Sequence, residues 1–298
     1  MKNTPIGGDS TAIFLLVVMG SLWGLQFAML KFLSQSGYSD LSILMVALFL
    51  LSLIFSGLMV IKRQFFKLDF GILRFFTITS LLGYLLPLLA VLYAAAELSA
   101  GILTLFACMA PVVATSLALS LRTEKVRPTR VAAVLLGVAS AVLILLPELQ
   151  IPDQGKLRWM LVALVVPLAY GIESIYISRH WPKGLTALQV VTGETVAATI
   201  LVAPIFLFVG SPLPNLFAGS EVTLAIVIFV GAGVLESLLY FRLIQQTGGV
   251  FVNFGTFISL FAGIAWGMIL FSESHSANVW ASATILILAI YLAREKRA

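Results

Sequence analysis

The stretch LAYGIESIYISRHW, residues 168–181, begins as an apolar helical run and then places a carboxylate, Glu173, inside it. Only 10% of the 298 residues are charged, whereas 60% are hydrophobic, and the mean hydropathy is +1.08. A soluble domain cannot bury that much apolar surface in one core. Runs of about 20 apolar residues recur along the chain, which is the length that crosses a bilayer as a helix. The sequence therefore predicts an all-α polytopic membrane protein.

Breaks in hydropathy predict ten transmembrane helices joined by short connections. The longest connection is the polar stretch PELQIPDQGK, residues 147–156, which leaves five predicted spans on either side. We therefore expect two five-helix repeats, residues 11–146 and 157–293. Because five is an odd number, the second repeat would enter the membrane from the opposite side and be inverted. The predicted spans are 11–31, 41–61, 72–93, 100–121, 129–146, 158–178, 186–209, 222–243, 249–271 and 278–293.

Lysine and arginine are distributed unevenly between the two sides of this arrangement. If the N-terminus is cytoplasmic, only three of the 18 basic residues, Lys31, Lys156 and Arg158, fall on the outer side. Cytoplasmic loops of membrane proteins carry an excess of Lys and Arg. We therefore expect both termini in the cytoplasm. The same excess accounts for the formal net charge of +5 without a nucleic-acid partner.

The two halves share a short pattern in their first helices. SLWGLQFAML, residues 21–30, aligns with LAYGIESIYI, residues 168–177, and this alignment sets Gln26 opposite Glu173. Inverted repeats are frequent in secondary transporters, whose binding site lies near the repeat interface. The pattern favours a transporter with its site at the level of Gln26 and Glu173.

Two short motifs stand out: Trp23-Gly24 after a run of small residues, and Pro111 followed thirteen residues later by Glu124. With these motifs the chain resembles the EamA-type branch of the drug/metabolite transporter superfamily. The resemblance covers residues 11–293. It implies an inner-membrane carrier of small metabolites, often an exporter, with a central cavity between the helices. It implies no particular substrate, because fold and family do not fix the solute.

Three carboxylates, Glu173, Glu194 and Glu236, fall inside predicted spans. A charge at the centre of a membrane helix costs about 2.5–3.5 kcal/mol on insertion scales, so each needs a partner, water or a proton. At 1.5 Å per residue, Glu173 lies ~9 Å from Arg179 and Glu236 ~9 Å from Arg242, both at cytoplasmic helix ends. Glu194 lies ~12 Å into its span. The three carboxylates therefore occupy one layer on the cytoplasmic side of the midplane.

Aromatic and amide side chains accompany these carboxylates. Tyr170 and Tyr176 lie three residues on either side of Glu173, and Tyr240 follows Glu236 by four. Carboxylates flanked by aromatic rings suit an organic cation, through ion pairing and cation–π attraction. The candidate substrate-binding residues are Glu173, Glu236, Gln26, Tyr170, Tyr176, Tyr240, Trp23, Tyr84 and Asn253, with Glu173 and Glu236 also assigned to proton coupling.

Several of these residues have structural alternatives. The start of the seventh span is ambiguous, so we interpret Glu194 as a residue of the hydrated interface, with a cavity position as the alternative. Glu236 is alternatively a structural partner of a basic residue on another helix. Trp23 and Tyr84 are alternatively interfacial aromatic anchors.

The sequence contains no phosphate-binding loop, nucleophile–base pair or metal-ligand cluster, so we expect no enzyme, cofactor or bound metal. The prediction is a secondary transporter, in the export direction, of a small amine or amino acid-like solute that is cationic or zwitterionic. Alternating access with protons as counter-ions is the expected mechanism. The alternatives are a facilitator of neutral or aromatic amino acids and a membrane receptor or enzyme without transport. The expected partners are the solute and membrane lipid, with the oligomeric state left open.

Overall fold

The computed structural model describes residues 9–94, 106–122, 127–145, 157–209, 220–272 and 277–292. Within these ranges the protein is helical and contains no strand. The elements are α1 (Asp9–Gln35), α2 (Asp40–Ile61), α3 (Phe70–Ser80), the π-helical turn η1 (Leu81–Leu85), α4 (Leu86–Ala94), α6 (Ala110–Leu121), α7 (Pro128–Leu145), α8 (Leu157–Ala163), α9 (Val165–His180), α10 (Ala187–Val209), α11 (Ser220–Thr247), α12 (Gly249–Val252), α13 (Gly255–Phe271) and α14 (Ala277–Leu292).

The helices fall where hydropathy predicted spans, and the all-α membrane class is confirmed. Seven helical segments of the described chain are long and apolar enough to cross a bilayer, and three further apolar helices are shorter. The count of ten spans in two inverted repeats stays a prediction. The predicted loop 147–156 and Glu124 lie outside the described residues.

Local chemistry sets several helix ends. Ser39 accepts a hydrogen bond from the Ser42 amide at the start of α2, and Asp69 accepts one of 2.8 Å from the Ile72 amide at the start of α3. These side chains satisfy amides that have no partner within the helix. At their C-terminal ends, α6 and α13 terminate in left-handed residues, Arg122 (φ 50°) and Ser272 (φ 54°). Caps of this kind stop each helix at the edge of its apolar run.

Two interruptions follow directly from proline. Pro87 lacks an N–H and cannot donate a hydrogen bond to the carbonyl four residues earlier. The π-helical turn η1 comes shortly before Pro87, and the Leu86 amide at its end donates a hydrogen bond to the Leu81 carbonyl. Pro167 follows the break at Leu164 between α8 and α9 for the same reason. Of these two irregular segments, η1 lies on the wall of the cavity described in the next subsection, through Gly83 and Tyr84.

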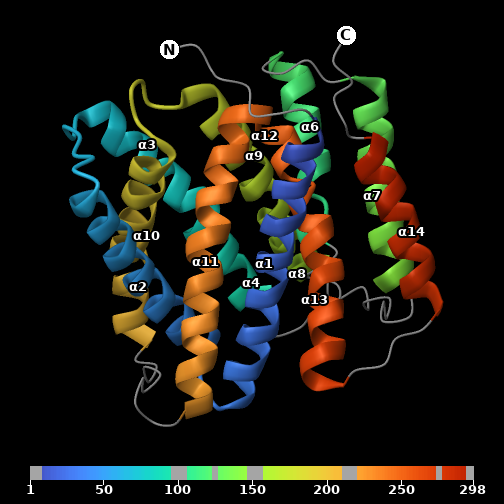
Figure 1. Cartoon of the computed structure of the whole chain (residues 1–298), viewed down its shortest axis with the longest axis horizontal. Coiled ribbons are helices and arrows are strands. Elements are labelled where there is room, and N and C mark those ends of the chain that lie inside the picture. Colours follow the sequence, from blue (N-terminus) through green and yellow to red (C-terminus); the bar gives the residue numbers. More distant parts are fainter. Residues whose placement is uncertain are drawn as a thin grey trace.

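The helices pack as a bundle with α1 between α11 and α13 (Figure 1). Helix α2 pairs with α10 on one side, where Ser52 and Thr199 share a hydrogen bond of 2.9 Å. Helix α7 pairs with α14 on the other side, where Ser140 donates a hydrogen bond of 2.7 Å to the Ser282 carbonyl. Large apolar side chains point outward from the bundle, including Phe208, which is 94% exposed. An exterior of this kind suits contact with lipid.

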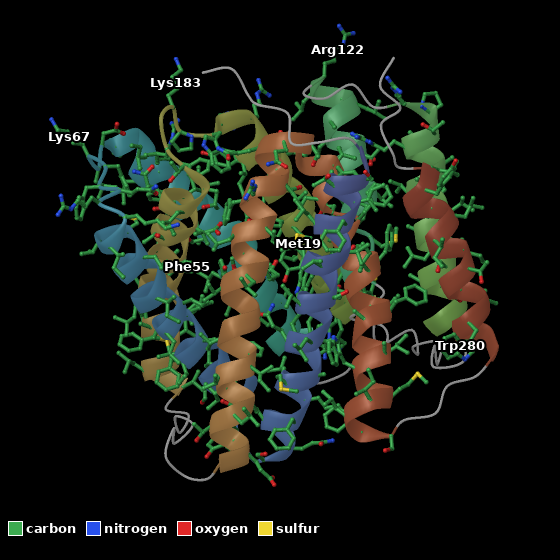
Figure 2. The ribbon with its side chains drawn as sticks, viewed as in Figure 1. Met19, Phe55, Lys67, Arg122, Lys183 and Trp280 are labelled. Atoms are coloured by element: carbon green, nitrogen blue, oxygen red, sulfur yellow. The ribbon has the colours of Figure 1, made fainter. Side chains whose placement is uncertain are left out.

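Charged residues mark one end of the bundle. Figure 2 shows Lys67, Arg122 and Lys183 at the same end, with Trp280 near the opposite end. These three cations belong to connections that the sequence assigned to the cytoplasm. The end that carries them is called the basic end below.

Candidate functional site

A cavity of about 310 Å³ lies among α1, α2, η1, α4, α9, α10, α11 and α12. Its wall is mostly apolar, and its polar groups converge from separate helices. The polar and aromatic residues on the wall are Trp23, Gln26, Tyr84, Tyr170, Glu173, Glu194, Glu236, Ser237, Tyr240 and Asn253. An apolar pocket with a few convergent polar groups is the usual form of a small-molecule site. Eight of the nine residues proposed from the sequence therefore lie on one cavity wall.

Glu173 lies at the centre of this polar cluster and is only 4% exposed. Its Oε2 accepts a hydrogen bond of 2.9 Å from the Tyr240 hydroxyl on α11. On the other side it meets the backbone of η1, where a Cβ added at Gly83 would lie 2.9 Å from Glu173 Oε1. Gly83 therefore leaves the space that the carboxyl group fills.

Glu194 also lies on the cavity wall, which corrects its interpretation as an interfacial residue. It is 2% exposed, and its Oε1 is buried without a hydrogen-bond partner among the described residues. The Ser80 hydroxyl donates a hydrogen bond of 2.8 Å to the backbone carbonyl of Glu194, which holds α10 against α3 at this position. Helix α10 packs directly on α3 here, because Gly193 lets the Phe76 ring approach its backbone. This tertiary contact, rather than the sequence around the start of the span, buries Glu194.

Glu236 reaches the cavity from α11 and is less enclosed than the other two carboxylates. Its Oε2 accepts a hydrogen bond of 3.3 Å from the neighbouring Ser237 hydroxyl. Of the residues described, no Lys, Arg or His lines the cavity. No described residue of the wall therefore supports the structural alternative, in which a basic side chain pairs with Glu236. Within the same ranges, no three acidic, His or Cys side chains are grouped to hold a metal ion.

The aromatic candidates divide between cavity and packing. Trp23 and Tyr170 meet edge to face at 6.2 Å, and both lie on the cavity wall. Tyr176 does not line the cavity, because its ring stacks with Phe75 at 5.7 Å and with His180 at 4.5 Å. Positions three residues on either side of Glu173 diverge by about 120° around a helix, so only one of these tyrosines faces the cavity.

The two amide candidates lie at different places on the wall. Gln26 reaches from α1 towards α11, where its Oε1 would lie 3.3 Å from a Cβ at Gly233. Asn253 lies at the break between α12 and α13, and its Nδ2 donates to the Ser174 hydroxyl (2.6 Å) and the Gly249 carbonyl (2.7 Å). Asn253 is 5% exposed and ties this break to α9.

Comparison with known proteins agrees with this arrangement. Residues 10–146 match the model of the EamA-like transporter family. The chain is similar to a solved crystal structure described only as that of a protein, with a TM-score of 0.78, 15% identity, and coverage of 96% of this chain and 97% of that chain. At that identity the likeness shows a common fold alone. No curated protein matches the sequence.

The expected resemblance to EamA-type proteins is thereby confirmed, and members of that family are transporters rather than enzymes. The apolar helices place the protein in a membrane, and its transporter class implies a small-molecule solute. The match of residues 10–146 to the EamA-like transporter family indicates a membrane transporter of the drug/metabolite superfamily.

Proposed function

We propose that this protein is a secondary transporter that exports a small organic cation or zwitterion in exchange for protons. The observation that carries the proposal is the cavity wall, where three carboxylates face one space that has no basic side chain among its described lining residues. A buried charge in a membrane protein needs a counter-charge, water or a proton. A solute with a positively charged nitrogen supplies that counter-charge.

The surrounding rings support the same class of solute. Trp23, Tyr84, Tyr170 and Tyr240 lie on the wall with the carboxylates. Aromatic faces attract organic cations, and the attraction is larger where water is excluded. A volume of about 310 Å³ suits a molecule the size of an amine or amino acid.

The packing supports two inverted repeats with boundaries near residues 146 and 157. Gly24 and Gly171, which the repeat alignment sets opposite each other, both allow close helix contacts. A Cβ at Gly24 would lie 2.6 Å from Ala262 Cβ on α13, and one at Gly171 would lie 2.6 Å from Val113 Cβ on α6. Helices α6 and α13 belong to the fourth and ninth predicted spans, which are also repeat mates. The pairs α2–α10 and α7–α14 join repeat mates directly.

The shape of the cavity supports alternating access. Its wall includes Leu30 near the end of α1, Leu44 near the start of α2 and Val91 near the end of α4. These residues lie towards the end of the bundle that the sequence assigns to the outside. On the opposite side of the carboxylates, the Asn253–Ser174 contact closes the wall. We propose that this arrangement is one of two access states, open outward.

The basic end supports an orientation with both termini in the cytoplasm. Lys67, Arg122 and Lys183 gather there, and basic connections are retained on the cytoplasmic face during insertion. In a bacterial cell the corresponding membrane is the inner, or plasma, membrane. Outward transport then means movement from the basic end to the Leu44 end.

Counterflow in proteoliposomes tests the proposed function. Purified protein is reconstituted, loaded with unlabelled phenylethylamine, and supplied with the labelled amine outside. We expect protein-dependent exchange that is driven by an imposed proton gradient. Exchange of phenylalanine but not of the amine, with no effect of the gradient, would favour the facilitator of neutral or aromatic amino acids instead. Absence of flux across amines and amino acids would contradict the proposal.

A further inference from the structure

A second hollow lies on the outside of the bundle, between the third and sixth predicted spans. It is a groove of about 590 Å³ whose wall is formed by α4, α8 and the start of α9. Helix α4 packs on both of these helices. Because Leu86, Leu89 and Tyr93 are between 39% and 56% exposed, the groove opens to the lipid-facing exterior. The lining residues are Leu86, Leu89, Ala90, Tyr93, Val162 and Val165.

One end of this groove carries an aromatic pair and a cation. The rings of Tyr93 and Trp159 lie 4.5 Å apart, and the Arg158 guanidinium lies 4.6 Å from the centre of the Trp159 ring. Tyrosine and tryptophan are enriched at the level of the lipid headgroups. A guanidinium stacked on a ring still presents the hydrogen-bond donors in its plane, which fit a phosphate group. Arg158 is exposed and is therefore accessible to a headgroup beside this end.

The groove runs inward from this end along both of its walls. On α4, Leu86 lies seven residues before Tyr93, which corresponds to ~10 Å along a helix. On the other wall, Val165 lies seven residues after Arg158, which is again ~10 Å. Helix α9 leads from there to Lys183 at the basic end, so Arg158 lies towards the opposite end. The groove therefore begins at headgroup level and continues into the acyl-chain layer of the leaflet remote from the basic end.

Helix α4 separates this groove from the central cavity. Pro87, Leu88 and Val91 line the central cavity, whereas Leu86 and Leu89 line the groove. A molecule in the groove therefore contacts the outer face of a helix whose inner face forms part of the central wall.

We propose that the groove and Arg158 bind one anionic phospholipid, with an acyl chain along α4 and the phosphate at the Arg158 guanidinium. The apolar wall matches the chain, the Tyr93–Trp159 pair matches the interfacial region, and the cation matches the phosphate. A zwitterionic headgroup places a second positive charge near Arg158, so a headgroup with a net negative charge, such as phosphatidylglycerol, binds more tightly. The inference does not depend on which solute enters the central cavity.

Lipid binding to the purified full-length protein tests this proposal. Dioleoylphosphatidylglycerol is added to delipidated protein in detergent, and its affinity is measured by native mass spectrometry beside that of dioleoylphosphatidylcholine, which has the same chains. We expect one phosphatidylglycerol to bind at least about fivefold more tightly, and Arg158→Gln to abolish this preference, because one cation near a membrane surface contributes about that factor. Lys31→Gln is the matched control, because Lys31 lies 4.9 Å from the centre of the Phe271 ring, outside this groove.

A variant of the groove tests the acyl chain separately from the headgroup. Leu89→Trp fills the groove and should lose binding of both lipids. Leu135→Trp, at a position of α7 that is 63% exposed and does not line the groove, should retain it. Glycerol 3-phosphate, which has the phosphate without the chains, should not displace the lipid. Equal loss in Lys31→Gln and Arg158→Gln, unchanged binding in Leu89→Trp, or displacement by glycerol 3-phosphate would overturn the proposal.

Fluorescence quenching locates the lipid without changing the charge or the apolar wall. The chain has five tryptophans, of which Trp159 lies at the end of the groove. An equimolar amount of phosphatidylglycerol with brominated chains should quench wild-type fluorescence, and Trp159→Phe should lose most of this quenching. Trp280→Phe is the control, because Trp280 is 59% exposed on α14. Quenching that persists in Trp159→Phe, or that falls equally in Trp280→Phe, would refute the site. None of these measurements involves transport, so their outcome is separate from that of the proposed function.

Discussion

At the scale of single residues, the site depends on how closely helices approach one carboxyl group. Glu173 receives the Tyr240 hydroxyl on one side and faces Gly83 on the other. The hydrogen bond stabilises the charged form, and the glycine leaves room for it. Small changes at these positions should therefore alter solute binding without unfolding the bundle.

Glu173→Gln should fold normally and lose pH-dependent transport of cations. Glutamine retains the shape and hydrogen-bonding capacity of the side chain but carries neither a charge nor an exchangeable carboxyl proton. We expect the initial rate of amine counterflow to fall by at least about tenfold, as follows from losing an interaction with a charged group. Glu221→Gln is the matched control, because Glu221 is an exposed glutamate at the start of α11. An equal loss in both variants would show a general effect of removing a negative charge.

Gly83→Ala should reduce cation affinity more than it reduces stability. The new methyl group would lie 2.9 Å from Glu173 Oε1, so the carboxyl group or η1 must move. Gly231→Ala is the control, because nothing lies within 4 Å of a Cβ at that helical position. There, alanine should stabilise the helix by about 0.5–1 kcal/mol and leave binding unchanged. Affinity for phenyltrimethylammonium, a permanently charged organic cation, and the melting temperature are measured for both variants. Unchanged affinity in Gly83→Ala would contradict a role of the Gly83–Glu173 approach in solute binding.

At the scale of helices, the broken segments shape the cavity. The π-helical turn η1 presents Tyr84 and Gly83, and the break between α12 and α13 presents Asn253. Irregular backbone is tolerated at membrane depth where it is buried in protein or lines a cavity. Helix α12 packs on α9 where the Gly249 backbone meets the Ser174 carbonyl, on the side of the cavity towards the basic end.

Gly249→Ala should disturb the closure between α12 and α9. The added methyl group would overlap the backbone at Ser174, which cannot move aside as a flexible side chain can. Overpacking of this kind costs about 1–3 kcal/mol. We expect a lower melting temperature and faster labelling of a cysteine introduced at Val252, the neighbouring residue on the cavity wall, in a Cys108→Ala background. Gly57→Ala, at a helical position of α2 with nothing within 4 Å, should leave the labelling rate unchanged and, by the same helix effect as Gly231→Ala, should not lower the melting temperature. Identical labelling in both variants would argue against a closure at this place.

At the scale of the whole molecule, the distribution of charge supports the proposed orientation. The three labelled cations lie at one end of the bundle (Figure 2), and the cavity wall extends towards the other end. Long apolar side chains, such as Phe208 and Leu207, cover the outside between the two ends. In the exchange that we propose, protons enter and solute leaves at the end remote from the basic residues.

Single cysteines in a Cys108→Ala background test this orientation. Lys67→Cys and Lys183→Cys should resist a membrane-impermeant thiol reagent on intact cells, whereas Ser36→Cys, in the connection between α1 and α2, should react. After the cells are opened, all three should react, which controls for accessibility. The reverse pattern on intact cells would invert the direction of transport that we propose.

Local physical chemistry made much of this protein predictable. Hydropathy located the apolar helices because a bilayer acts on every segment independently of its partners. A fixed rise per residue predicted a common depth for Glu173 and Glu236, and both lie on the cavity wall. Eight of the nine proposed residues reach the cavity for these reasons.

Tertiary structure decided what helix periodicity leaves open, namely which face of each helix meets which neighbour. The sequence placed Glu194 inside a predicted span and favoured an interfacial position for it, but the packing of α10 against α3, permitted by Gly193 beside Phe76, buries it on the cavity wall. Tyr176 shares the helix of Glu173, but contacts with Phe75 and His180 hold its ring away from the cavity. Which side chains from separate helices meet at the cavity depends on interhelical distances of a few ångströms. Hydropathy and the helical repeat fix depth along the membrane, whereas such distances arise only when side chains from distant parts of the chain pack together.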